Sequence, residues 1–375
     1  MVNLQSIVAA AAAALMFQVS YAHPGGDADQ ELVERAAFLQ KLGPRAPNAC
    51  QTKLAERGVA AKLAERRNAM IKDIRAKRGL QAHAPFLQAR DLKKVLATNH
   101  HYTGSAITAE STPDVIFAGV NETVLAPETT EGPYYVSGEL VRSDVTEEEP
   151  GVPLALHIQL IDINTCEPLP NIALEIWHCN ATGVYGGVTA GGMGNGDAAD
   201  TTLLQKKALR GIQVSDKDGV VSFESIFPGH YTGRAIHIHI MSHVDAKVNP
   251  NNTLSGGTVA HVGQLYFDQD LITQVEKVAP YSQNTARITT NENDFILAQG
   301  AGNEHDPVAE YIFVGDGVDD GIFSWLTVGI DPANEKTVNA AATCTETGCT
   351  SRSGGGFGLL GGLAGLFGGF GGRGN

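Results

Sequence analysis

His237 and His239 lie two residues apart in the apolar run GRAIHIHIMSH, and Arg234 stands three residues before the first histidine. In a β-strand alternate side chains share a face, so the two imidazoles point one way and the isoleucines between them point the other. Two imidazoles on one face can hold a metal ion, because histidine is the commonest metal ligand. Two exposed histidines on a half-buried strand would give the same pattern, so this segment alone leaves both interpretations open.

Two tyrosines precede these histidines. Tyr231 lies in PGHY, six residues before His237, and Tyr185 follows a Gly-containing turn after an expected strand that ends at Trp177. A tyrosine hydroxyl has a pKa near 10, so its phenolate is a useful ligand only for a strongly acidic hard cation, of which ferric iron is the obvious biological case. Zinc or copper would more usually recruit a third His, a Cys or a carboxylate.

Several motifs in this region resemble one enzyme family. WHCNATGVY, PGHY, RAIHIH and GQLYFD, preceded by TTEGPYYV (129–136) and VRSD (141–144), occur in this order. Together they resemble the intradiol ring-cleavage dioxygenases, over about residues 120–300. The resemblance implies a non-haem Fe(III) enzyme that uses dioxygen to cleave catechol-type rings between their two hydroxyls, giving muconate-type dicarboxylic acids.

The resemblance also implies a set of metal ligands. One Fe(III) per chain would be bound by Tyr185, Tyr231, His237 and His239, with a solvent hydroxide as fifth ligand. Ferric iron with two phenolates and one hydroxide sums to zero charge, which an apolar interior tolerates. Tyr231 would act as a base for one of the two catechol protons.

Residues beside the substrate are implied by the same resemblance. Arg234 and Gln264 match positions next to the substrate ring, where an always cationic guanidinium would stabilise developing negative charge. Pro133, Tyr134 and Trp177 match positions of the pocket walls. These three residues could equally well be ordinary core residues of a β-sandwich.

Composition sets the limits on the fold and its partners. The chain has 375 residues, of which 43% are hydrophobic, enough for the core of one large or two small domains. Its formal net charge is −14, although residues 51–94 hold twelve Lys and Arg against four Asp and Glu. An acidic body argues against nucleic acid as a partner.

The pattern along the chain predicts an all-β protein with a helical N-terminal arm. Residues 23–106 are expected to form this arm or a propeptide, with Val59, Leu63, Met70 and Ile74 at helical spacing. The next part of the chain, through residue 345, alternates short β-branched and aromatic runs with turn residues, which indicates an antiparallel sandwich or barrel, and we expect the β-sandwich.

Two further segments have predictable structure. Asp218-Gly219, between two alternating apolar runs, predicts a β-hairpin. The last part of the chain, 346–375, is a Gly-rich tail that we expect to be disordered, because a glycine-rich segment loses much conformational entropy on folding and has few side chains to bury in return.

The first residues predict secretion. Residues 1–22 contain an Ala-rich apolar stretch followed by Ser20 and Ala22, small residues at the −3 and −1 positions of a signal-peptidase site. A membrane anchor is the alternative, but the run is short for a span, so we expect no membrane association. Sequons at Asn121, Asn180 and Asn251 fit a secreted glycoprotein.

Five cysteines allow at most two intrachain disulfides. Cys344 with Cys349 would close a small loop, and Cys166 with Cys179 would join neighbouring strands, but the sequence leaves the connectivity open.

Two other functions compete with the enzyme. A non-catalytic module that binds aromatics or cell-wall polymer would use Tyr185 and Tyr231 for stacking. A cupin oxygenase would have a Glu ligand soon after His-x-His, and none occurs in HIHIMSHVDAK. The preferred catechol, a homodimer and a cell-wall contact through the tail are left open.

Overall fold

In a computed structural model of the chain, the described residues are 50, 53–54, 56–80, 129, 131–189, 200–301 and 306–351. The expected signal peptide, Asn121 and residues 352–375 of the expected tail lie outside them. No helix within these ranges is long and apolar enough to cross a membrane.

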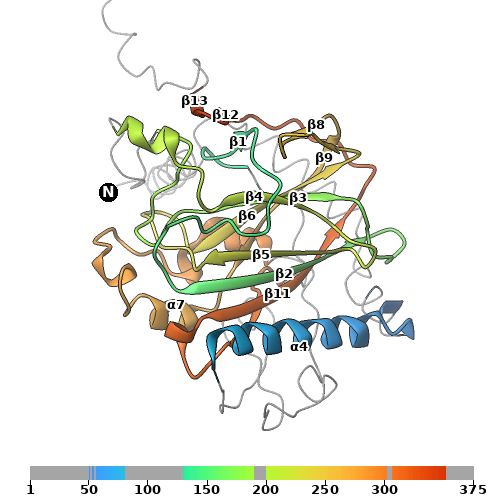
Figure 1. The fold of residues 1–375 in the computed structure, drawn as a ribbon, viewed down its shortest axis with the longest axis horizontal. Helices are drawn as coiled ribbons and strands as arrows, with labels where there is room; N and C mark the ends of the chain where they lie inside the picture. Colours follow the sequence, from blue (N-terminus) through green and yellow to red (C-terminus); the bar gives the residue numbers. More distant parts are fainter. Residues whose placement is uncertain are drawn as a thin grey trace, which may run out of the picture.

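Two four-stranded sheets form the body of the protein (Figure 1). The first runs in the order β10 (Glu310–Phe313), β11 (Ile322–Ile330), β2 (Pro153–Asp162) and β5 (Val220–Ile226). The second runs in the order β4 (Arg210–Val214), β3 (Ala173–Trp177), β6 (His237–Val244) and β9 (Thr258–Tyr266). All pairs within these sheets are antiparallel except β11 with β2, which run parallel. The predicted all-β sandwich is therefore confirmed, with this one parallel pair as a departure from an all-antiparallel arrangement.

The core between the two sheets explains why apolar side chains occupy every second position of the strands that line it. Ile238 and Ile240 of β6 are fully buried in the largest apolar cluster, together with Leu174 and Ile176 of β3. His237 and His239, which alternate with these isoleucines along β6, therefore face the other side of the second sheet. The predicted division of β6 into an apolar and an imidazole face is confirmed.

Smaller elements complete the fold. Two short strands, β7 (Lys247–Val248) and β8 (Leu254–Ser255), pair with each other. Short helices α7 (Gln269–Val275) and α8 (Phe295–Gly300) come after β9, and single 3-10 turns lie at Thr201–Gln205, Tyr281–Gln283, Asn291–Asn293 and Val318–Asp320.

A third sheet covers the imidazole side of the second sheet. It consists of β1 (Val136–Ser137), β12 (Ala342–Thr345) and β13 (Gly348–Ser351), with β12 in the middle. In Figure 1 these strands lie beyond β4 and β6, on the side opposite β2 and β11. Their apolar side chains join a second buried cluster with residues of β3, β6 and β9. The face that carries the histidines is therefore closed by residues that come before β2 and after β11 in the chain.

Helix α4 (Val59–Arg78) covers the outer side of the first sheet. Its Ala64 and Ile71 are buried in a cluster with Phe323 and Trp325 of β11, and Figure 1 shows the helix lying along β2 and β11. The helix ends at Gly79, whose left-handed conformation (φ 65°) lets its N–H bond back to the carbonyl of Ala76. The helix predicted from apolar spacing in this arm is confirmed here, and it packs on the sandwich.

The prediction of a hairpin at Asp218-Gly219 is wrong. A tight turn forms, with the Gly219 N–H bonded to the Asp216 carbonyl and Gly219 at a φ of 73°. However, the strand before the turn pairs with β3 and the strand after it pairs with β2, so the chain crosses from one sheet to the other. A local turn signal does not specify which sheet each flanking strand joins.

The disulfides join Cys50 to Cys166 and Cys344 to Cys349. The short loop expected for CTETGC is confirmed, because β12 and β13 pair with these two cysteines opposite each other. A bond between Cys166 and Cys179 is contradicted: Cys166 lies in the turn after β2 beside Cys50, and the buried Cys179 thiol donates to the Gly229 carbonyl.

We expect loss of the Cys50–Cys166 disulfide to destabilise the protein more than loss of Cys344–Cys349. The first pair spans 116 residues and the second spans 5, and a cross-link restricts the unfolded chain more when its loop is longer. Replacing Cys50 and Cys166 together by Ser should lower the free energy of unfolding by about 2–5 kcal/mol. Urea unfolding of both double variants measures this, and equal losses would contradict the explanation.

Candidate metal centre

The two histidines of β6 bring their Nε2 atoms to 3.0 Å from each other, and both side chains are buried. The Nδ1 atom of His237 donates to the Ala235 carbonyl at 2.6 Å, because a carbonyl only accepts. The hydrogen therefore sits on Nδ1, and Nε2 keeps its lone pair for a metal.

A tight turn brings Tyr231 to the same place. Tyr231 and Arg234 form an isolated β-bridge, and Gly233 between them takes a φ of 95°, which favours glycine. The chain thus reverses just before β6, and the Tyr231 hydroxyl lies 3.3 Å from the Nε2 atom of His237. The short spacing between Tyr231 and His237 is therefore sufficient to bring them together.

Tyr185 reaches the site because its loop packs directly on the segment that carries Tyr231. The Asn180 side chain accepts the N–H groups of Thr182 and Val184 and shapes this loop. At Gly183 (φ 82°) a Cβ atom would lie 2.1 Å from the His230 carbonyl oxygen, so only glycine allows this approach. The Tyr185 ring then lies edge-on to Tyr231, with ring centroids 5.8 Å apart.

Tyr185 also faces the histidine pair, since its ring centroid is 6.4 Å from that of His239. The four side chains predicted as ligands, Tyr185, Tyr231, His237 and His239, are all buried and lie around one point. The structure thus brings together residues from three separate segments of the chain.

These donor atoms fit a single metal ion. Two ligand atoms about 2.1 Å from one ion, at a right angle, are about 3.0 Å apart, close to the 3.0 and 3.3 Å separations along Tyr231, His237 and His239. Burial raises the pKa of Tyr185 and of Tyr231, although the charge of Arg234 opposes the shift at Tyr231. A trivalent cation would supply the positive charge that the two buried phenolates require.

Arg234 is held beside this cluster by three side chains. Its Nε atom donates to Asp294 at 2.9 Å, and its Nη2 atom donates to Gln264 at 2.6 Å and to the Tyr266 hydroxyl at 2.8 Å. Burial alone would raise the pKa of Asp294, but Arg234 and backbone N–H groups bring it below its ordinary value. Arg234 and Gln264, both predicted to lie beside the substrate ring, are thus bonded to each other in a charged network that includes two further residues.

The sequence analysis assigned no role to Asp294 or to Tyr266, although Tyr266 lies within the motif GQLYFD. Tyr266 lies two residues after Gln264 on β9, so alternation along the strand would place it on the same face. Asp294 lies in the segment NEND before α8, and no motif in the sequence connects it to Arg234.

Aromatic rings pack against the candidate ligands. Trp177 stacks on His239 with centroids 4.8 Å apart, and Tyr134 stacks on Tyr185 at 4.4 Å. Pro133 is half-buried next to Tyr134. Tyr134 and Trp177 are also buried members of the cluster beneath the third sheet, which fits the core interpretation, and their place in the pocket wall stays a prediction.

The other histidines near the motifs have separate partners. His178 bonds with Ser225, His230 with Glu276 and His243 with Glu175, each at 2.7–2.8 Å. Burial lowers the pKa of His261 to about 3. None of these four was predicted as a ligand.

We expect Asp294→Asn to lower the free energy of unfolding by about 3–5 kcal/mol, because it leaves a buried guanidinium without its carboxylate. The pKa of Asp294 is depressed in the folded protein, so its stabilisation is present above the ordinary Asp pKa of about 3.9 and is lost as the pH falls through the folded value. Urea unfolding at about pH 7 and below about pH 3 checks this. A difference between wild type and variant that did not shrink in acid would contradict it.

Comparison with known proteins agrees with this geometry. Residues 130–294 match a family model described as Dioxygenase. A catechol 1,2-dioxygenase of Pseudomonas sp. strain EST1001 is 25% identical over 243 residues, which cover 60% of this chain and 70% of that protein. A catechol 1,2-dioxygenase of Acinetobacter baylyi strain ATCC 33305 / BD413 / ADP1 is 31% identical over 110 residues, 28% of this chain and 32% of that protein.

A solved structure of an intradiol ring-cleavage dioxygenase from Tetranychus urticae is 29% identical and covers 56% of this chain and 96% of its own, with a TM-score of 0.47. The matched family model and the catechol 1,2-dioxygenase relatives agree with the motifs that meet at the site. Residues 130–294, less than half of the chain, are therefore similar to the intradiol ring-cleavage dioxygenase family.

Proposed function

We propose that this protein is a secreted non-haem Fe(III) dioxygenase that cleaves catechol-type rings between their two hydroxyls. One observation carries the proposal: Tyr185, Tyr231, His237 and His239 converge, with donor atoms at the separations of adjacent ligands along Tyr231, His237 and His239. These four side chains would hold one ferric ion per chain.

Ferric iron bound there would act as a Lewis acid that withdraws electron density from a catechol and makes its ring susceptible to dioxygen. In the reaction the bond between the two hydroxyl-bearing carbons breaks, and both oxygen atoms of dioxygen enter the resulting dicarboxylic acid. No external reductant is needed, because dioxygen takes all four electrons from the substrate.

The protein contributes proton transfer, charge and shape. As a phenolate, Tyr231 would accept one catechol proton on its oxygen and become a neutral tyrosine, and its side chain is slightly more exposed than those of the other three. Arg234, fixed by Asp294 and Gln264, would stabilise negative charge on the ring as it develops. The stacked rings of Trp177 and Tyr134 exclude water from the ligands.

The rival function as an aromatic-binding module has less support. Such a module needs accessible rings for stacking, whereas Tyr185 and Tyr231 are 0% and 5% exposed. Their burial against two imidazoles favours metal binding over the capture of a polymer.

Secretion is part of the proposal. The two disulfides support it, because such bonds persist in oxidising compartments. Of the sequons, Asn251 is exposed and suits a glycan, whereas the Asn180 amide donates to Glu149 within the folded loop. We therefore expect glycosylation at Asn251 rather than at Asn180.

Iron-loaded protein tests the proposal directly. We expect a visible absorption band from ferric tyrosinate, which changes when catechol is added without oxygen, and oxygen uptake when both are present. Protein that binds ferric iron without a visible band, or that takes up no oxygen with any catechol, would contradict it.

Substitution of the ligands tests the residue assignment. Tyr185→Phe and His239→Ala should each reduce iron affinity by more than the roughly 10- to 100-fold cost of an outer-shell change, and abolish oxygen uptake. Tyr281→Phe is the matched control, since Tyr281 is equally buried but donates to the Phe227 carbonyl, away from the site. Unchanged iron binding in Tyr185→Phe would overturn the assignment.

A further inference from the structure

Arg210, the first residue of β4, uses its buried side chain to connect two segments of the candidate site. Its Nη2 atom donates to the Tyr134 carbonyl at 2.7 Å, and its Nε atom donates to the Gly186 carbonyl at 2.9 Å. Gly186 directly follows Tyr185 in the chain. The guanidinium therefore joins the backbones that carry the two stacked rings of Tyr134 and Tyr185.

A third bond fixes the orientation of this guanidinium. The Nη1 atom of Arg210 donates to Glu139 at 3.1 Å, and both side chains are only 2–3% exposed. Burial and the nearby Glu175 raise the pKa of Glu139 well above its ordinary value, although Arg210 opposes this shift. The carboxylate and the two carbonyls thus surround one planar cation.

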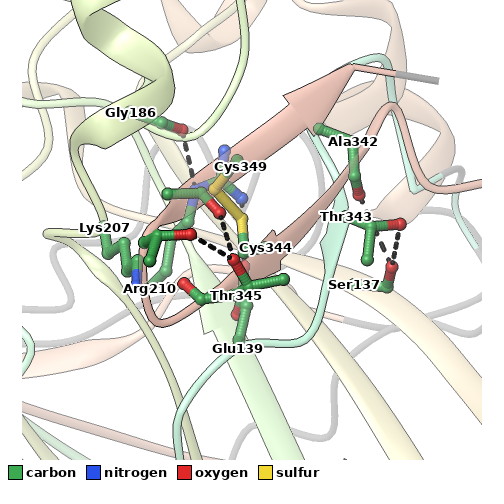
Figure 2. Close-up of a disulfide and its surroundings, with 12 residues drawn as sticks. Ser137, Glu139, Gly186, Lys207, Arg210, Ala342, Thr343, Cys344, Thr345 and Cys349 are labelled. Atoms are coloured by element: carbon green, nitrogen blue, oxygen red, sulfur yellow. Dashed lines mark hydrogen bonds and ion pairs between the residues drawn. A yellow bond between two sulfur atoms is a disulfide. The ribbon is translucent and has the colours of Figure 1, made fainter. Parts of the chain in front are cut away.

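The site of these bonds lies beneath the third sheet. Figure 2 shows the Gly186 carbonyl directed at Arg210 beside the disulfide of β12 and β13. Gly187 lies between these groups, because a Cβ atom there would be 3.4 Å from both the Arg210 Nε atom and the Cys349 sulfur. The loop after Tyr185 is therefore held between the arginine and the disulfide.

Arginine suits this position better than lysine. Its planar guanidinium presents several N–H groups in fixed directions, whereas the lysine ammonium is a point charge on a flexible stem. The three acceptors bond to three different nitrogen atoms of Arg210, an arrangement that the single nitrogen of a lysine cannot reproduce. The guanidinium carbon also lies 5.8 Å from the centre of the Tyr185 ring, within the range of a cation–π contact.

We propose that Arg210, oriented by Glu139, is a positioning residue for Tyr185: it fixes the loop and the stacked ring, and so holds the Tyr185 side chain against Tyr231 and His239. This inference rests on the proposed role of Tyr185 as a ligand of ferric iron. It assigns to a side chain on β4, outside the ligand set, a part in the strength of the iron–tyrosinate bond.

The test compares Arg210→Lys with Arg142→Lys. Arg142 is a matched control, because it also donates to backbone carbonyls, those of Lys207 and Arg210, without contacting Tyr134 or Gly186. For Arg210→Lys we expect a roughly 10- to 100-fold loss of Fe(III) affinity in competition with a chelator, together with a shifted ferric-tyrosinate band. For Arg142→Lys both quantities should stay within about twofold of wild type.

Two further measurements separate positioning from general stability. In a Tyr185→Phe background, Arg210→Lys should cost little further iron affinity, because the two residues act through one ligand. If Arg210→Lys does not fold, Glu139→Gln takes its place, and we expect a loss of about fivefold or more with the same direction of band shift.

The outcomes also separate this inference from the proposed function. Wild-type protein without a ferric-tyrosinate band would overturn the proposed function and the inference with it. A normal wild-type band, with Arg210→Lys or its substitute matching Arg142→Lys in affinity and band position, would overturn the inference alone. Additive losses with Tyr185→Phe would likewise overturn it, because they would show that Arg210 acts independently of Tyr185.

Discussion

The alternation of side chains along β6 is the constraint on which the site depends. Ile238 and Ile240 are fixed in the core between the two sheets, so His237 and His239 must face the other side. A slip of one residue would exchange the two faces and would place both imidazoles in the apolar core. The packing of the sandwich therefore fixes the direction of the two imidazole donors before any loop contributes.

The tyrosines reach these donors through loops, whose positions depend on close backbone contacts. Gly183 allows the loop of Tyr185 to touch the His230 carbonyl, and the bridge between Tyr231 and Arg234 holds the turn before β6. Loops lack the regular pairing of strands, so such contacts must replace it. The third sheet then covers the aromatic side chains of the site on the side away from the second sheet.

Two buried arginines lie on this side of the second sheet, each paired with a carboxylate: Arg234 with Asp294, and Arg210 with Glu139. Burying such pairs costs desolvation energy that their attraction barely repays, so they are weak sources of stability. These pairs instead fix the orientation of each guanidinium. Each guanidinium connects side chains or carbonyls from distant segments, which apolar contacts alone would leave free to shift.

The sequence by itself determined the sandwich class, the two faces of β6 and, through the motifs of a family, the four residues that meet. It could not determine the cysteine pairing, the crossing of the chain at Asp218-Gly219 or the partners of Arg234 and Arg210. Periodicity and turn signals report on neighbours within a few residues. By contrast, Asp294 lies 60 residues from Arg234, and Arg210 lies 76 residues from Tyr134. Only the packing of the strands brings such residues together, because their contacts depend on the order of strands in the sheets and leave no local pattern.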